Sequence, residues 1–364
     1  MKIYVTGGAV RDTLMGLPPK DIDYVVVGSS PAEMEALGFE KVGASFPVYL
    51  KNGEEYALAR QERKVGVGYN GFEVMYDSTV TLEDDLIRRD LTMNSMAVDL
   101  DNWDKFRNAR SNEVRKRWLI DPHNGLGDLN CYLIKHTSQS FADDPVRVLR
   151  TARFAARYDR FWVHSDTMTL MATVVHEIEF VPRERIWTEV HKGLCEDNYW
   201  TMFHILREVG ALDQNCLTSF SKFDAIAHTF NRTNQLTPIE RFAILSFNFS
   251  DQDYVKLTVP NNYSRLSQFF WASIRGCENY KQLTPVQKVE LFERMRVFNE
   301  FNQITAPLLN CMISAIPSSQ FSVVELFSDY VRLISVDTTA IASQFTSGLD
   351  IKNAIKYARV NALC

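Results

Sequence analysis

The chain has 364 residues, of which 46% are hydrophobic and 23% are charged, and its formal net charge is -5. This composition predicts a globular protein of two or three domains and excludes a general affinity for polyanions, so an RNA partner would need a local basic surface. The six cysteines lack CxxC spacing, and the N-terminus has no signal peptide. A transmembrane helix needs about 20 apolar residues, and no stretch approaches that length. We therefore expect a cytoplasmic protein with reduced thiols and no membrane contact.

The first predicted elements are a strand, a glycine turn and a helix. The strand covers Ile3–Val5 and is followed by Gly7 and Gly8. An amphipathic helical turn then covers Ala9–Met15. Glycines let backbone N–H groups approach a phosphate, and the start of the following helix favours negative charge there. Arg11 lies in the first helical turn, where it can close on a triphosphate. We therefore expect Gly8 and Arg11 to bind nucleotide phosphates.

Two aspartates stand at the entrance of the next predicted strand, Tyr24–Val27. Because side chains alternate along a strand, the carboxylates of Asp21 and Asp23 project from one face and repel each other unless a cation lies between them. Mg²⁺ is typically bound by one or two carboxylates together with water and substrate phosphates. Either pattern alone is more typical of a tight turn or a solvated strand entry, but the two together predict a Mg²⁺ site beside a triphosphate site.

Short-range patterns predict the next elements. Ser30, followed by a proline, is a typical helix start, and the predicted helix covers residues 30–37. Residues 46–60 predict a hairpin, because Asn52 and Gly53 are the residues that a type I′ turn favours.

A helix predicted over residues 143–160 has two different sides. Its apolar side contains Val148, Leu149, Ala152, Ala155 and Ala156. Its opposite side carries Arg150, Arg153, Arg157 and Arg160. We expect the apolar side to pack and the arginine side to face a cleft, with Asp144 and Arg147 as neighbours on its edge.

Five sequence runs together carry a resemblance to a known family. They are GGAVRD followed by DIDYVVVG, RRDLTMNSMA (88–97), DPHNGLGDL (121–129), DDPVRVLRTARFAARY (143–158) and RERIWTE (183–189). In this order they resemble the motifs of the bacterial-type tRNA nucleotidyltransferases, which are the CCA-adding enzymes and their poly(A) polymerase relatives. The resemblance fades past residue 210.

The resemblance implies an α+β fold in three parts. A polymerase-beta-like nucleotidyltransferase head with a mixed sheet would cover residues 1–140, and a helical neck with the nucleotide-selecting helix would cover 141–210. An all-helical body and tail that bind tRNA would cover 211–364. Apolar spacing predicts helices there and just before, at 200–209, 238–249, 285–298, 323–334 and 349–358.

The implied activity is addition of C, C and A to the tRNA 3′ end from CTP and ATP. Asp21 and Asp23 would hold Mg²⁺, and Arg89 would join Gly8 and Arg11 on the triphosphate. Glu55 would be a third catalytic carboxylate, with an exposed strand residue as the alternative. The partners would be the acceptor stem and 3′ end of tRNA, with no obligate protein partner evident.

The selecting helix would take the place of a nucleic-acid template. Asp144 and Arg147 would read the Watson–Crick edges of CTP and ATP, and Arg150 and Arg153 would also hold the nucleotide. The alternatives are that Asp144 only caps the helix and that the arginine row is a solvated face. Asp143 departs from the family, which has Glu at this position.

Two segments have more specific implications. In the family, a loop at the place of residues 61–71 is needed for the final A. Residues 103–119 form a basic insertion, which predicts either a hairpin extension that contacts the tRNA backbone or a solvated insertion.

Two alternative functions stay open, and a third is excluded by residue content. A poly(A) polymerase usually has a longer basic C-terminal region than this chain, and a catalytically silent RNA-binding protein would gain nothing from two clustered aspartates. Phe247 and Asn248 stand where a metal phosphohydrolase domain would have a His-Asp pair, and the last histidine is His228, so no intact HD domain is expected.

Overall fold

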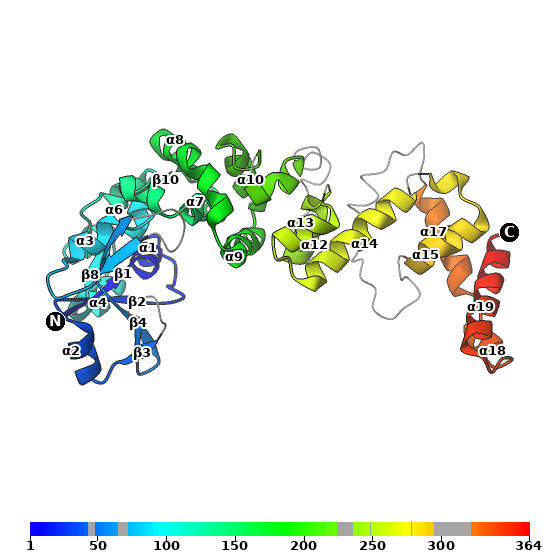
Figure 1. Ribbon diagram of the computed structural model, residues 1–364, viewed down its shortest axis with the longest axis horizontal. Helices are drawn as coiled ribbons and strands as arrows, with labels where there is room; N and C mark the ends of the chain where they lie inside the picture. The colour runs from blue at the N-terminus through cyan, green and yellow to red at the C-terminus, as the bar shows by residue number, and fades with distance from the viewer. Residues whose placement is uncertain are drawn as a thin grey trace. The chain divides into compact units, whose positions relative to one another are not determined.

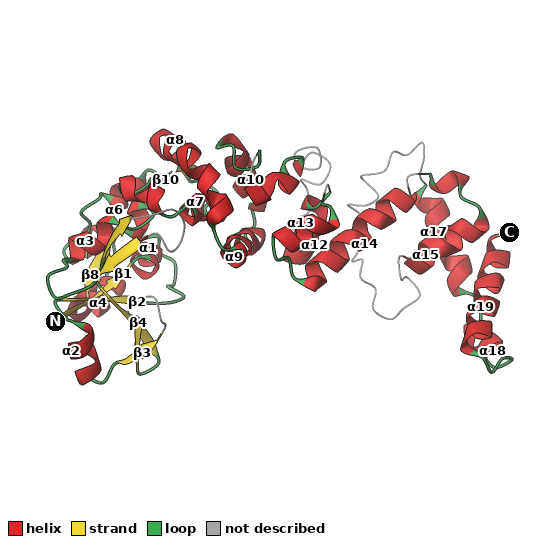
Figure 2. Cartoon of the chain, in the orientation of Figure 1, coloured by secondary structure: helices red, strands yellow, loops and turns green. Residues whose placement is uncertain are grey.

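The computed structural model describes residues 1–42, 48–64, 72–213, 215–223, 236–247, 249–277, 279–294 and 322–364. The chain divides into two compact units, Met1–Thr218 and Ser219–Cys364. Strands occur only in the first unit among these described ranges, and the last of them ends at Val163 (Figures 1 and 2).

Unit 1 is built on a seven-stranded mixed sheet with the order β3-β4-β5-β2-β1-β8-β9. Strands β2 and β5 are parallel, whereas the other neighbouring pairs are antiparallel. The strands are β1 Lys2–Thr6, β2 Asp23–Val27, β3 Glu40–Val42, β4 Val48–Lys51, β5 Glu54–Leu58, β8 Ala97–Asp99 and β9 Leu119–Ile120. The mixed sheet and the helical remainder confirm the predicted α+β class.

The predicted hairpin is formed by β4 and β5. Asn52 and Gly53 connect the strands with φ angles of 55° and 81°, the left-handed values that a type I′ turn needs at both positions. Strands β6 (Gln61–Lys64) and β7 (Phe72–Met75) form a separate antiparallel pair. Most of the predicted 61–71 loop, residues 65–71, lies outside the described residues.

Short helices surround the sheet, as Figure 1 shows for the blue and cyan part of the chain. They are α1 Gly8–Leu14, α2 Pro31–Ala36, α3 Leu82–Ile87, the 3-10 helix η1 Thr92–Asn94, α4 Leu100–Arg107, α5 Asn112–Arg115 and α6 Gly125–Asn130. Helix α2 confirms the helix predicted at 30–37. Its start is fixed by a capping box in which Ser30 and Glu33 each bond the other's backbone N–H.

The basic insertion at residues 103–119 is mainly helical. Of its two predicted forms, the hairpin extension is therefore wrong. Trp103 and Phe106 lie three positions apart on α4 and are 4% and 0% exposed. Residues at that spacing share a helix face, and here they pack into the protein instead of projecting toward solvent. The exposed cations Arg107 and Lys116 pair with Asp104 and Glu113.

The rest of unit 1 is mainly helical. Its elements are β10 Leu133–Ile134, η2 Gln139–Asp143, α7 Val146–Arg157, β11 Trp162–Val163, α8 Ser165–Val174, η3 Val175–Phe180, α9 Arg183–Leu194 and α10 Tyr199–Glu208, followed by η4 Asn215–Phe220 at the boundary. Helix α7 packs against both α9 and α10, and its predicted apolar side is buried. The pairing of β11 with β10 corrects the all-helical prediction for this stretch.

The described part of unit 2 is helical. It contains α12 Pro238–Leu245, α13 Asp251–Lys256, α14 Asn261–Cys277, η5 Tyr280–Gln282, α15 Pro285–Arg294, α17 Val323–Ile334, α18 Thr338–Ala342 and α19 Gly348–Leu363. Helix α14 was not predicted; it packs on α12, where Trp271 Nε1 donates to the Ala243 carbonyl at 2.7 Å. Nowhere in the described ranges is a helix both long and apolar enough to cross a bilayer.

Candidate functional site

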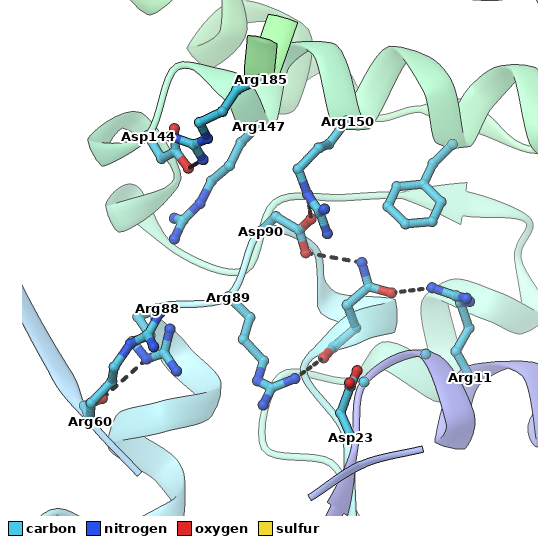
Figure 3. Close-up of a pocket in the computed structure, with 14 residues that line it drawn as sticks. Arg11, Asp23, Arg60, Arg88, Arg89, Asp90, Asp144, Arg147, Arg150 and Arg185 are labelled. Carbon is cyan, nitrogen blue, oxygen red and sulfur yellow. Dashed lines mark hydrogen bonds and ion pairs between the residues drawn. The ribbon is translucent and has the colours of Figure 1, made fainter. Parts of the chain in front are cut away.

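A cavity of about 450 Å³ lies in unit 1 between the end of the sheet and α7 (Figure 3). Seven arginines line it: Arg11, Arg60, Arg88, Arg89, Arg147, Arg150 and Arg185. Three aspartates also line it: Asp23, Asp90 and Asp144. This excess of positive charge favours an anionic ligand.

The glycine turn forms one wall of the cavity. Gly7 has φ 67°, a left-handed value that residues with a Cβ atom rarely adopt. A Cβ atom at Gly7 would lie 2.9 Å from Arg89 Nη1, closer than such atoms normally approach. Glycine is therefore required here both by the backbone and by the neighbouring guanidinium.

Arg11 is buried in this wall, with only 4% of its surface exposed, and its contacts fix the guanidinium. Its Nε donates to Asp12 Oδ1 at 2.8 Å, and its Nη1 donates to Asn94 Oδ1. The guanidinium also lies over the rings of Phe154 and Tyr158 on and just after α7, at 5.2 and 5.7 Å from their centroids. The predicted phosphate ligand is thus oriented before any ligand binds.

Asp90 lies at the centre of the cavity (Figure 3). Its Oδ1 accepts from Asn94 Nδ2 and from the Leu91 backbone N–H, each at 2.9 Å, and its Oδ2 accepts from Arg150 Nε at 2.8 Å. Burial by itself would raise the pKa of Asp90, but the charge of Arg150 and the donated hydrogen bonds lower it. The Arg150 pKa is raised in turn, chiefly by the Asp90 charge.

The two predicted base-reading residues line the opposite wall. Asp144 Oδ1 accepts from the Val146 backbone N–H at 3.1 Å, and Oδ2 accepts from Arg185 Nη2 at 2.8 Å. Arg147 Nη1 donates to the Ser140 carbonyl at 2.6 Å. Asp144 therefore contacts the first turn of α7, as the capping alternative requires, and also faces the cavity.

The predicted arginine row does not face a single cleft. Arg150 lines the cavity, but Arg153 is 8% exposed and donates from Nε to Glu189 Oε2 of α9 at 2.7 Å. Arg157 pairs with Asp12 at 3.6 Å, and Arg160 follows the end of α7. Helical periodicity gave the directions of these side chains but not the elements that pack against them.

The three predicted carboxylates differ in their placement. Asp23 lines the cavity at the first position of β2, whereas Asp21 is exposed, precedes the strand and is not among the lining residues. Glu55 is exposed on β5, and the parallel register that pairs Tyr24 with Tyr56 sets it beside Asp23 on the neighbouring strand.

The described residues of the chain offer few protein ligands for a metal ion. Across the described residues, no three His, Cys, Asp or Glu side chains cluster closely enough to hold a metal ion. The hard oxygen donors of Asp23 and Asp21 nevertheless suit Mg²⁺, which completes its coordination with water and substrate phosphates.

Sequence reasoning did not assign roles to three residues of this region. Arg88 stands in the RRDLTMNSMA run and was explained only by the helix dipole, and Asp85 precedes it by three positions. Arg60 has no short-range sequence signal, because it lies just after β5 and its place at the cavity depends on the pairing of β5 with β2.

Comparison with known proteins agrees with this geometry. Residues 3–135 match the poly(A) polymerase head domain. Nucleotidyltransferases of this family use a divalent metal. Residues 160–215 match a second family, described as a probable RNA- and SrmB-binding site of polymerase A.

Curated relatives match somewhat more than half of the chain. A multifunctional CCA protein of Cupriavidus necator is 50% identical over 216 residues, which are 58% of this chain and 50% of that protein. The corresponding protein of Aromatoleum aromaticum is 51% identical over 216 residues, 58% of this chain and 49% of that protein. The chain thus spans about half the length of the curated relatives it matches.

Solved structures extend the likeness of the fold beyond the head domain. A CCA-adding enzyme in complex with CTP superposes with a TM-score of 0.64 at 20% identity, covering 100% of this chain and 86% of that chain. The complex of a CCA-adding enzyme with ATP gives 0.63 at 20% identity, with the same coverage. At this identity the likeness concerns the fold.

Proposed function

We propose that the chain adds C, C and A to the 3′ end of tRNA from CTP and ATP, in a Mg²⁺-dependent reaction that releases diphosphate. The observation that carries this proposal is one cavity in which Asp23 and the glycine turn face Asp144 and Arg147. The identity with multifunctional CCA proteins over 58% of the chain supports it.

The phosphate end of the cavity suits a nucleoside triphosphate. Gly8, Arg11 and Arg89 would orient the triphosphate, and positioning of this kind accounts for much of the rate of phosphoryl transfer. Asp23 and Asp21 would hold Mg²⁺, which lowers the pKa of the tRNA 3′ hydroxyl and stabilises the attacking and leaving oxygens. Glu55 would assist from the neighbouring strand.

The opposite end suits selection of the base. Cytosine and adenine both present an exocyclic amino donor beside a ring-nitrogen acceptor, whereas uracil and guanine present a carbonyl acceptor beside a ring N–H donor. A carboxylate such as Asp144 accepts from the amino group, and the Arg147 guanidinium donates to the ring nitrogen. Uracil or guanine would set a carbonyl oxygen against the carboxylate and an N–H group against the guanidinium, which costs binding free energy. Arg150 and Arg153 would support the nucleotide indirectly through Asp90 and Glu189.

The tRNA would be bound mainly outside this cavity. We assign the head to residues 1–140, the neck to 141–210 and a tRNA-binding body and tail to 211–364. The match of residues 160–215 to a probable RNA-binding family supports an RNA partner for the neck.

The test is nucleotide addition to a tRNA transcript that lacks its 3′ CCA, with each labelled triphosphate and Mg²⁺. We expect growth by three nucleotides from CTP and ATP alone, loss of addition in Asp23→Ala, and full activity in a control, Asp166→Ala, whose side chain is 72% exposed. Asp21→Ala and Glu55→Gln, assayed in parallel, separate the metal ligands from the neighbouring carboxylate.

Other outcomes would replace the proposal. The family description names poly(A) polymerase, and long tails from ATP alone would favour that activity. Tight tRNA binding without any addition would favour a silent RNA-binding protein.

A further inference from the structure

Asp85 is a fully buried carboxylate behind the arginine wall of the cavity. It belongs to α3, is 0% exposed, and is not itself among the residues that line the cavity. Its Oδ1 forms an ion pair with Arg88 Nη2, and its Oδ2 accepts from Arg89 Nε at 3.2 Å and from Arg89 Nη2 at 2.9 Å. One carboxylate thus joins two adjacent lining arginines.

The same carboxylate also reaches the short connection between β5 and β6. Asp85 Oδ1 accepts from the Arg60 backbone N–H at 3.4 Å, and Arg88 Nε donates to the Arg60 carbonyl at 3.1 Å. Both the backbone N–H and the carbonyl of Arg60 are therefore hydrogen-bonded, immediately before β6 begins at Gln61. Figure 3 shows the second of these bonds, from Arg88. Three lining arginines, from two separate segments of the chain, depend on this carboxylate for their arrangement.

The electrostatics explain why a carboxylate stands here. Two guanidinium groups held side by side repel each other, and a buried carboxylate is stable only when paired. Burial alone would raise the pKa of Asp85, but the charges and hydrogen bonds of Arg88 and Arg89 outweigh burial and lower it to about 2. Asp85 is thus ionised at neutral pH and balances the arginines before a ligand binds.

We propose that Asp85 is a positioning residue for triphosphate binding, acting through Arg89 and Arg88. The inference rests on the proposed function, because it takes Arg89 as a phosphate ligand. Arg89 has further contacts, from Nη2 to Thr6 Oγ1 at 3.0 Å and from Nη1 to the Asn94 carbonyl at 3.4 Å. Loss of Asp85 therefore weakens binding but does not abolish it.

The direct test is Asp85→Asn in the full chain. The amide is of similar size but turns N–H donors toward the arginines, so their orientation is lost. We expect the Kd for ATP, for CTP and for inorganic triphosphate, each with Mg²⁺ in calorimetry, to rise by about tenfold. Because the contacts are to the phosphates, the two nucleotides lose affinity equally, and KM rises more than kcat falls.

A double-mutant cycle tests whether Asp85 acts through Arg89. Arg89→Met alone should weaken triphosphate binding, and Asp85→Asn should cause a smaller further loss in the Arg89→Met background than in wild type, because only its action through Arg88 remains. Independent, multiplicative losses would overturn the inference. If Asp85→Asn does not fold, Asp85→Asn with Arg88→Met removes one of the repelling cations, and the same tenfold loss is expected there.

The control is a buried carboxylate of the same kind in unit 2. Asp329 is 6% exposed and accepts from Lys288 Nζ and from the Tyr280 hydroxyl, each at 2.8 Å. Asp329→Asn should lower thermal stability and leave triphosphate affinity unchanged. If Asp85→Asn behaved in the same way, with fewer active molecules and an unchanged KM, Asp85 would have only a folding role.

The outcomes also separate this inference from the proposed function. A wild-type chain that binds triphosphate but extends no tRNA would refute the proposed function, and the binding comparison would still decide the role of Asp85. A wild-type chain that binds no triphosphate would overturn the inference together with the phosphate site.

Discussion

Asp144 and Arg185 form an ion pair of 2.8 Å between the start of α7 and the first turn of α9, 41 positions apart in the chain. Both residues line the cavity, and Figure 3 shows the pair on the wall opposite Arg89. The carboxylate proposed to read the base thus has a fixed orientation, which is set by a helix that does not contain it.

Removal of this partner should reduce base selectivity. In Arg185→Met, the Asp144 carboxylate loses the donor that orients it, so we expect the preference for CTP and ATP over UTP and GTP to fall by about tenfold. The measurement is single-turnover addition with each triphosphate. Lys192→Met is the control on the same helix, because Lys192 is 53% exposed and does not line the cavity. Unchanged selectivity in Arg185→Met would show that Asp144 needs no such support.

Gly7→Ala should impair phosphate binding more than folding. The substitution costs about 1–3 kcal/mol in backbone strain, because φ 67° with ψ -123° lies outside the left-handed helical region that other residues can adopt. The added Cβ would also displace the Arg89 guanidinium. Gly16→Ala is a matched control, since Gly16 has φ 73° but nothing within 4 Å of an added Cβ. We expect both variants to lose stability, and we expect weaker triphosphate binding, measured by calorimetry, only in Gly7→Ala. Equal binding by the two variants would contradict the role of the turn.

Arg153→Met should lower stability with little effect on nucleotide affinity. Arg153 and Glu189 form a buried pair of 2.7 Å, with side chains 9% and 6% exposed, and removing one partner of such a pair costs about 3 kcal/mol. Denaturant unfolding measures the loss. Lys192→Met, whose exposed ammonium lies 3.7 Å from the same Glu189, should change stability by less than about 0.5 kcal/mol. A large rise in the Kd for ATP in Arg153→Met would instead make Arg153 a direct ligand.

The lowered pKa of Asp85 predicts a pH-dependent contribution to stability. The native pKa is about 2 and the usual value is 3.8, so the unfolded chain binds this proton more tightly than the native one. The stabilisation, about 2 kcal/mol, is therefore present above about pH 4 and lost as the pH falls through about 2. We expect the difference in unfolding free energy between wild type and Asp85→Asn to shrink from pH 7 to pH 3. A constant difference would mean that the carboxylate is not held ionised by its arginines.

Local patterns predicted the elements whose causes are local. The glycine turn, the Ser30 capping box and the Asn52-Gly53 hairpin each depend on residues within a few positions of one another. The resemblance also led us to expect Gly8, Arg11, Arg89, Asp144 and Arg147 in one site, and all five line the same cavity. Their roles in nucleotide binding stay predictions.

Tertiary partners account for what was missed. Arg153 was expected in a cleft because a helical wheel does not reveal that Glu189, 36 positions later, packs against it. Residues 103–119 suggested a surface for the tRNA backbone because Trp103 and Phe106 are interleaved with basic residues, whereas both aromatic side chains are buried by the packing of α4 on β1 and β8. No short-range pattern singles out Asp85, because the Arg60 backbone that it contacts lies 25 positions earlier in the chain.

The contacts of Arg11 and Asp12 set a limit on where this protein can be recombined with its relatives. The head-domain match ends at residue 135, yet Arg11 lies over Phe154 and Tyr158, and Asp12 pairs with Arg157. A chimera joined at the edge of the match would replace the aromatic and cationic partners of α1 with those of another lineage. Exchange of the catalytic module should therefore succeed only with a junction beyond Tyr158, so that α1 and α7 are inherited together.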